Sequence, residues 1–213
     1  MDIQVWSDLV CPWSYIGRRR LEKALDGLTA DVRVTFRAYQ LDRMPVPDPL
    51  PTKQALAQKF GGAARAERML ARVAAVAAGD GLELNFDRAI AANTFDAHRL
   101  VAWAAGQGRQ IDMIDALQRA HFTDGVDIGS RMALATVSAS IGLDGRRALA
   151  YLDADGGIQA VADDLAEARE LGISSVPTFV VDYRYAIRGA QEPATLRAAL
   201  AEIARRQVVD TRR

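Results

Sequence analysis

The sequence predicts an α/β protein in which an all-helical insertion interrupts a smaller unit of strands and helices. Both ends of the chain carry short strand-like runs beside helical ones, whereas residues 52 to about 155 are rich in Ala, Leu, Arg and Glu and lack strand alternation. The chain has 213 residues, enough for one large domain or for a domain with an insertion.

The first unit reads as strand, helix and strand. Residues 2–6 alternate weakly and predict a strand, and residues 12–26 predict a helix. Residues 31–39 alternate between polar and apolar side chains, which is a clear strand pattern. A strand–helix–strand unit favours a parallel pair of strands.

The middle of the chain begins with a proline-rich linker. Prolines stand at every second position from 45 to 51, where they prevent a helix or a central strand. Beyond them, glycines separate helical runs. We expect helices over about 53–60, 63–79, 87–105, 110–122, 130–140 and 144–153, and Thr94 or Asn93 could cap a new helix inside the third. The sequence therefore divides into one domain formed by residues 1–45 and 157–213 and a helical insertion domain formed by residues 46–156.

The end of the chain returns to strands and helices. We expect a helix over 158–171 and strands over 176–181 and 183–187, joined by a turn at Asp182. A last helix should run from Glu192 to about 206, because proline at position 193 suits the first turn of a helix.

Composition excludes several classes of protein. The 27 Lys and Arg residues balance the 27 Asp and Glu residues, so charge gives no reason to expect a nucleic-acid or membrane partner. The longest apolar run, residues 73–78, is far shorter than the roughly 20 residues that span a bilayer. The first residues lack the pattern of a secretory signal, and a single cysteine excludes an internal disulfide framework. We expect a cytoplasmic protein.

The most informative motif is Cys11-Pro12-Trp13-Ser14, at the predicted start of the first helix. Unpaired N–H groups and the helix dipole favour a thiolate there, and the thiolate is the reactive form of cysteine. The spacing is that of a Cys-x-x-Cys redox motif whose second sulfur is replaced by oxygen. We expect Cys11 to be an exposed, reactive thiol beside a partly exposed Trp13, and the alternative is a buried structural thiol.

Several segments resemble the DsbA family, and in particular its FrnE-like members. The resemblance implies a thioredoxin fold interrupted by a helical insertion. The same clan includes kappa-class glutathione transferases and 2-hydroxychromene-2-carboxylate isomerases, which use glutathione and have serine where Cys11 stands. The matching segments are residues 7–17, 93–100, 122–129, 172–181 and 189–191.

The resemblance also implies roles for residues outside the motif. Val176 would present its backbone to an extended peptide or to the cysteinyl part of a small thiol, and Pro177 would follow a cis peptide bond; otherwise Pro177 simply begins a strand in the trans form. Gln191 matches the position at which glutathione-using relatives hold the glutamyl end, or it caps the last helix. The second cysteine of the family falls at Ser14, which is a natural monothiol site, an engineered replacement of cysteine, or an inert residue.

Three further residues have two interpretations each, and Pro12 has one. Asp8 either accepts a proton near Cys11 or caps its loop. His98 either roofs the site or is a structural histidine. Asn93 either binds a ligand or caps a helix. Pro12 shapes the first helical turn. No metal site is expected, because His98 and His121 lack ligand spacing.

We expect a thiol–disulfide oxidoreductase that acts by a monothiol route. Cys11 would attack a protein or small-molecule disulfide, and a low-molecular-weight thiol such as glutathione would resolve the mixed disulfide as a co-substrate. No permanently bound cofactor is expected, and the sequence specifies no oligomeric state. The alternatives are a thiol-dependent isomerase or transferase and a non-catalytic module that binds peptides beside Val176 and Pro177.

Overall fold

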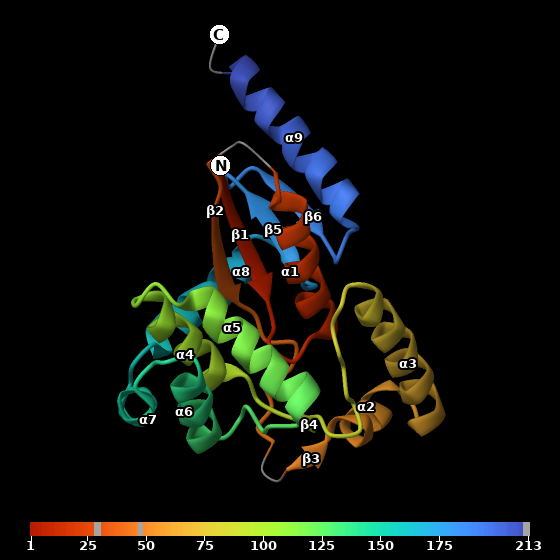
Figure 1. Cartoon of the computed structure of the whole chain (residues 1–213), viewed down its shortest axis with the longest axis vertical. Coiled ribbons are helices and arrows are strands. Elements are labelled where there is room, and N and C mark those ends of the chain that lie inside the picture. The colour runs from red at the N-terminus through yellow and green to blue at the C-terminus, as the bar shows by residue number, and fades with distance from the viewer. Residues whose placement is uncertain (28–30, 47–48, 211–213) are drawn as a thin grey trace.

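A four-stranded mixed sheet forms the centre of the computed structural model, which describes residues 1–27, 31–46 and 49–210. Its strands are β1 (Asp2–Ser7), β2 (Arg33–Ala38), β5 (Thr178–Val181) and β6 (Tyr185–Arg188). The spatial order is β2-β1-β5-β6 (Figure 1). β1 pairs in parallel with β2, as expected, and antiparallel with β5, while β5 and β6 form an antiparallel hairpin.

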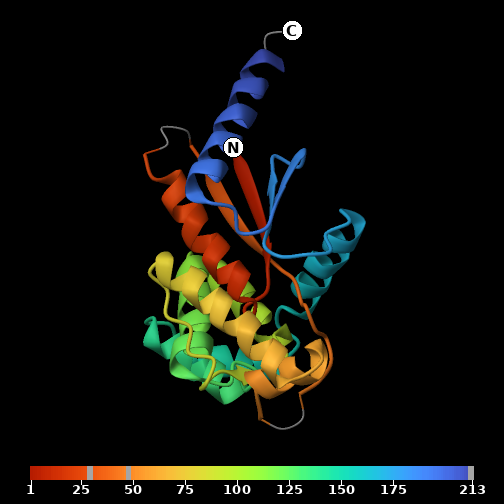
Figure 2. The ribbon, with the colours of Figure 1, turned by 90° about the vertical axis from the view of Figure 1, so that its right-hand side faces the viewer.

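Helices cover both faces of this sheet (Figures 1 and 2). On one face lie α1 (Pro12–Leu25) and α9 (Pro193–Asp210), and on the other lies α8 (Ile158–Glu170). Successive side chains of a strand point to opposite faces, so Ile3 packs with Leu21 of α1. Trp6 instead packs with Ala168 of α8.

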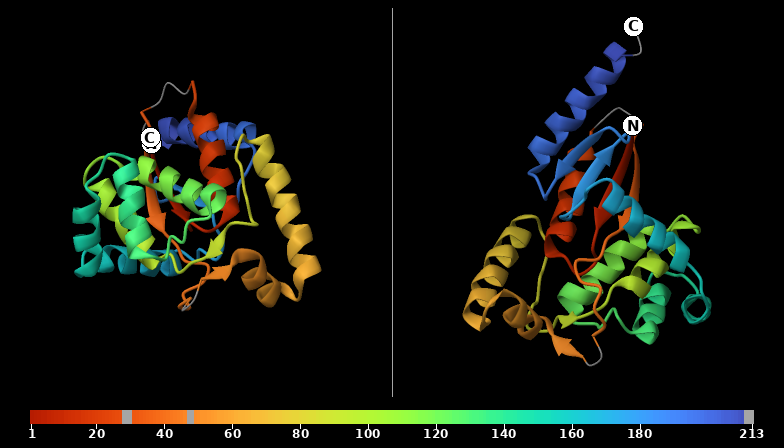
Figure 3. Two further views of the ribbon diagram at one scale, coloured as in Figure 1. Left: turned by 60° about the horizontal axis from the view of Figure 1, so that its bottom comes forward. Right: turned by 180° about the vertical axis from the view of Figure 1, so that it is seen from behind.

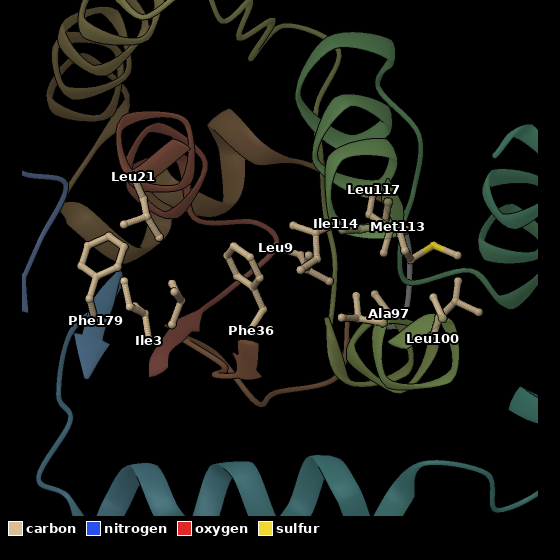
Figure 4. Close-up of a cluster of buried hydrophobic side chains, with 14 of the residues drawn as sticks. Ile3, Leu9, Leu21, Phe36, Ala97, Leu100, Met113, Ile114, Leu117 and Phe179 are labelled. Carbon is tan, nitrogen blue, oxygen red and sulfur yellow. The ribbon is translucent and has the colours of Figure 1, made fainter. Parts of the chain in front are cut away.

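The buried core of the sheet continues into a group of helices at one end of it. These helices are α4 (Phe95–Ala105), α5 (Gln110–Arg119), α6 (Arg131–Ser140) and α7 (Gly145–Asp153). Figure 4 shows Leu9 between Phe36 of the sheet and Ile114 of α5. Because one core of buried residues runs through both parts, the domain boundaries after residues 45 and 156 remain a prediction.

Two more helices lie to the other side of α1 (Figure 3). They are α2 (Thr52–Phe60) and α3 (Ala63–Gly79), followed by a loop that leads to α4. At the end of α3 the buried carboxylate of Asp80 binds Arg20 of α1 at 2.7 Å and Lys23 at 3.2 Å. This charge cluster holds the α2–α3 pair against α1.

The helix expected over 87–105 is wrong in its first half, whereas the expected possibility of a new helix capped at Asn93 or Thr94 is confirmed. Residues Ile90–Ala91 form a short strand, β4, which pairs with β3 (Leu50–Pro51), so the middle of the chain is not entirely helical. Helix α4 begins only at Phe95, whose N–H donates to the side chain of Asn93 at 2.9 Å. A side chain that accepts from the backbone in this way ends the preceding extended segment and starts a helix.

The helix expected over 110–122 ends as an α-helix at Arg119 and continues as a π-helix, η1 (Ala120–Asp124). The proline-rich linker ends in β3 at Pro51, and Pro47 lies outside the described residues. No helix in the described ranges is long and apolar enough to cross a membrane.

The buried Arg99 fixes α4 to the connection between α7 and α8. Its guanidinium donates to the backbone oxygens of Gly156 at 2.7 Å and Ala154 at 2.6 Å, and to Asp96 at 2.6 Å. We expect Arg99→Met to lower the free energy of unfolding by about 3 kcal/mol, because buried acceptors lose their donor. Urea unfolding measures this, with the exposed Arg205→Met as the control; equal midpoints for the two variants would contradict it.

Candidate active site

Four segments meet at the end of the sheet that faces the helical insertion. Parallel strands β1 and β2 both end there, and the antiparallel β5 begins there. Cys11 follows β1 as the N-cap of α1, with Pro12 in the first helical turn. The N–H of Cys11 donates to the backbone oxygen of Asp8 at 3.1 Å, which closes the turn between strand and helix.

The segment before β5 lies against this turn. The Val176–Pro177 peptide bond is cis, and the Cys11 Sγ lies 3.9 Å from the Val176 backbone oxygen. Helix α1 approaches Pro177 so closely that a Cβ at Gly17 would lie 2.6 Å from the proline Cγ. Sequence reasoning missed this role of Gly17, although a glycine inside a helix often marks a close approach.

The thiol of Cys11 is buried, which corrects the expectation of an exposed thiolate. Only 5% of the residue is exposed, and burial raises the pKa of the thiol from 9.0 to about 11. Hydrogen bonds from Ser14 and from the backbone of Trp13 lower this pKa, whereas the charge of Asp8 raises it. Desolvation therefore outweighs the helix terminus, and Cys11 is a neutral thiol at pH 7.

The other residues of the motif lie where they can act on Cys11. The Ser14 side chain is buried and accepts a hydrogen bond from the Asp8 N–H at 3.3 Å. Trp13 is 40% exposed, which agrees with the expected partial exposure, and its role as a wall beside the thiol remains a prediction. Pro12 is half-buried at the start of the helix.

Asp8 and His98 form a buried polar pair behind the thiol. The Asp8 Oδ2 accepts from the Leu41 N–H at 2.8 Å, so the carboxylate does cap a loop. The Asp8 Oδ1 lies 3.6 Å from the His98 Nε2 and has no hydrogen-bond partner among the described residues. The same Nε2 lies 3.0 Å from the Tyr39 backbone oxygen. One carboxylate oxygen thus remains available to a proton.

His121 is a neighbour of this pair that sequence reasoning considered only as a metal ligand. It is 1% exposed, and burial lowers the pKa of its imidazole to about 4, against the opposing charge of Asp8. It precedes Phe122, whose ring stacks on Tyr15 of α1 at 5.9 Å between centroids. No local pattern in the sequence shows that this π-helix faces α1.

Asn93 and Gln191 lie outside this group of contacts. The Asn93 side chain donates to the backbone oxygens of Arg43 and Met44 and accepts from Gln40, so its amide ties loops together. Gln191 is exposed and donates to the Arg188 backbone oxygen at 2.8 Å. The capping interpretation fits Asn93, and a ligand role for Gln191 remains a prediction.

A pH titration tests the burial of Cys11. A raised pKa in the folded state favours the neutral thiol, so its contribution to stability is present below pH 9 and lost as the pH rises toward 11. We expect the thiolate absorbance at 240 nm to appear with a midpoint near 11, and the unfolding free energy to fall over the same range relative to Cys11→Ser. A midpoint below 8 would contradict the buried thiol.

Comparisons with known proteins agree with this architecture. A model of the DSBA-like thioredoxin domain family matches residues 2–201. A probable DsbA oxidoreductase from Streptomyces coelicolor has 32% sequence identity and a TM-score of 0.90, over 95% of this chain and 89% of that chain. No match was found among curated protein sequences.

Two less similar structures share the fold. A 2-hydroxychromene-2-carboxylate isomerase has a TM-score of 0.73 and 16% identity over 98% of both chains. The cytosolic disulfide reductase DsbM from Pseudomonas aeruginosa, solved with GSH, has a TM-score of 0.67 and 22% identity over 96% of this chain and all of that chain. With a family model matched over nearly its whole length and a relative above 30% identity, this chain belongs to the DSBA-like thioredoxin domain family.

Proposed function

We propose that the protein is a monothiol thiol–disulfide oxidoreductase that works in the reducing direction, with an external thiol as resolver. The observation that carries this proposal is the site itself. Cys11 is the sole cysteine of the chain and lies beside Val176 and Pro177, and position 14 supplies a hydroxyl in place of a second thiol. A mixed disulfide on Cys11 therefore needs a thiol from outside the chain.

The burial of Cys11 supports the reducing direction. A strongly oxidising member of this fold needs a stabilised thiolate, because that stabilisation weakens its disulfide bond. Cys11 has the opposite property, since burial raises the pKa of its thiol to about 11. Because the reduced form of Cys11 has no stabilised thiolate, forming a mixed disulfide at its sulfur sacrifices no such stabilisation. DsbM, which shares the fold, is described as a cytosolic disulfide reductase and was solved with GSH.

The exchange conserves protons as well as electrons. As the Cys11 sulfur bonds to one sulfur of the substrate, the substrate disulfide breaks and the thiol proton passes to the leaving sulfur. The unpartnered Oδ1 of Asp8 is the acceptor that we assign to this proton in transit. Two external thiols then release Cys11 in two exchanges, so that the substrate gains two thiols and the external thiols become one disulfide.

The residues around the thiol define a substrate face. Val176 precedes the cis bond to Pro177 and would pair with an extended peptide or with the cysteinyl part of a small thiol. Trp13 offers a partly exposed ring beside it. The sequence motifs favour the FrnE-like branch of the family, and the need for an external thiol fits a cytoplasmic location.

The neutral state of Cys11 favours a second candidate function. A protonated thiol at a helix terminus can donate a hydrogen bond to the thiolate of a bound glutathione, as a serine hydroxyl would. The protein would then be a thiol-dependent isomerase or transferase, and the fold shared with 2-hydroxychromene-2-carboxylate isomerase is compatible with that chemistry.

One set of variants separates the candidates. We expect wild-type protein with glutathione to reduce a glutathionylated peptide, and mass spectrometry to find a mixed disulfide on Cys11. Cys11→Ser and Cys11→Ala should both abolish this activity, because neither retains a sulfur. An activity toward electrophiles that survives in Cys11→Ser and is lost in Cys11→Ala would support the isomerase or transferase instead. Peptide binding that is equal in all three proteins, without turnover, would indicate a non-catalytic module.

A further inference from the structure

A cavity lies between the edge strand β2 and helices α4, α5 and α8. It has a volume of about 370 Å³, and neither Cys11 nor Val176 lines it. Two of its lining residues, Ala105 at the end of α4 and Ala160 at the start of α8, are exposed, so the cavity opens to solvent. The volume falls at the lower end of the range of about 300–1,000 Å³ that is common for small-molecule sites.

The imidazole of His98 lines this cavity and contributes a free acceptor to it. Its Nε2 lies 3.0 Å from the Tyr39 backbone oxygen and 3.6 Å from the Asp8 Oδ1. Both oxygens accept hydrogen bonds, so Nε2 carries the proton of the neutral ring and Nδ1 keeps a lone pair. No described residue donates to Nδ1, and Nδ1 is not one of the fully buried polar atoms that lack a partner. This nitrogen is therefore open to a ligand that donates a hydrogen bond.

Three other polar side chains of the lining are closed to a ligand. Asp164 accepts from the Ala38 N–H at 2.8 Å and from Arg37 at 3.0 Å, so both of its oxygens are used. The Nε of Arg37 is fully buried and lies out of reach of the cavity. The side-chain amide of Gln110 donates to the Phe36 oxygen at 3.0 Å and accepts from the Phe36 N–H at 3.1 Å. The lining therefore offers no free cationic donor to an anion.

Negative charge predominates around the cavity. Asp163 lines it with an exposed carboxylate, Asp164 lines it as well, and Asp8 lies directly behind the imidazole. The single guanidinium in the lining belongs to Arg37, and Asp164 and Glu167 already share it. Because opposite charges attract at short range, this field favours a cation and opposes an anion.

We propose that this cavity binds a small organic cation, with an apolar ring or chain and an ammonium head. The ammonium donates a hydrogen bond to the His98 Nδ1 and lies in the negative field of Asp163 and Asp164. The apolar body packs against side chains of the lining such as Val101 and Ile114. The binding site does not depend on which reaction the thiol performs.

Three probes with one ring test the charge that this site selects. Benzylammonium is a cation, benzyl alcohol is a neutral donor and benzoate is an anion, and calorimetry measures the binding of each to the full-length protein at neutral pH. We expect benzylammonium to bind at least about tenfold more tightly than either of the other probes, a difference of about 1.4 kcal/mol. No binding of benzylammonium, or equal binding of benzyl alcohol or benzoate, would overturn the proposal.

The ring nitrogens of the two histidines report the contact directly. A nitrogen that accepts a hydrogen bond changes its ¹⁵N chemical shift, so benzylammonium should move the Nδ1 resonance of His98. The resonances of His121, which does not line the cavity, should stay unchanged and serve as the internal control. An unchanged His98 resonance at a saturating concentration of benzylammonium would show that the assigned contact is wrong.

Two substitutions locate the binding. Ala105→Leu and Ala160→Leu each place a larger side chain at an exposed position of the lining and leave the buried core unchanged, so the fold should be retained. We expect each to weaken benzylammonium binding at least about tenfold, while Ala201→Leu, at an exposed alanine of α9, leaves it unchanged. If benzylammonium binds all three variants as it binds the wild type, it binds elsewhere and the proposal fails. A circular dichroism melt of each variant verifies that it is folded.

Discussion

The burial of the Cys11 thiol against the Val176–Pro177 segment is the constraint on which the rest of the site depends. A helix N-terminus by itself favours a thiolate. Here α1 approaches Pro177 so closely that only glycine fits at position 17, and the thiol is almost fully removed from water. Burial costs the thiolate more hydration free energy than the hydrogen bonds at the helix terminus contribute in stabilisation. The protein therefore holds a neutral thiol.

The same packing organises the polar groups behind the thiol. Asp8 binds the Leu41 N–H with one carboxylate oxygen, and its own N–H donates to Ser14. His98 reaches from α4 to the Tyr39 backbone, so a residue of the helical insertion contacts the loop after β2. The insertion thus supplies part of the inner wall of the site, while Trp13 remains on the outer side.

Local sequence patterns predicted much of the fold. The strand alternation and helix composition located all four strands of the central sheet and most helices, and α3 has the expected bounds of 63–79. These features depend on neighbouring residues only. The motif at the start of the first helix identified Cys11 and Ser14, and the family resemblance identified Pro177.

Properties that depend on contacts between distant segments could not be predicted. Cys11 is buried because α1 packs closely on Pro177. A local sequence pattern does not reveal this contact, since the two segments lie far apart in the chain. The sequence did suggest that Asn93 could cap a helix, but it did not show that the same amide also binds backbone about fifty positions away. His121 lies on a helix whose face toward α1 is set by the packing of Phe122 on Tyr15.

The equilibrium between Cys11 and glutathione disulfide tests the central claim most directly. Purified protein is equilibrated with defined ratios of reduced and oxidised glutathione at pH 7, and intact-mass spectrometry measures the fraction carrying a Cys11–glutathione disulfide. The constant is that for the reaction of reduced Cys11 with oxidised glutathione to give the Cys11–glutathione disulfide and reduced glutathione. For a thiol without thiolate stabilisation this constant should be of order one, as for two ordinary thiols. A constant about a hundredfold smaller would mean that the reduced form is stabilised as a thiolate, and would contradict a buried, neutral and reducing Cys11.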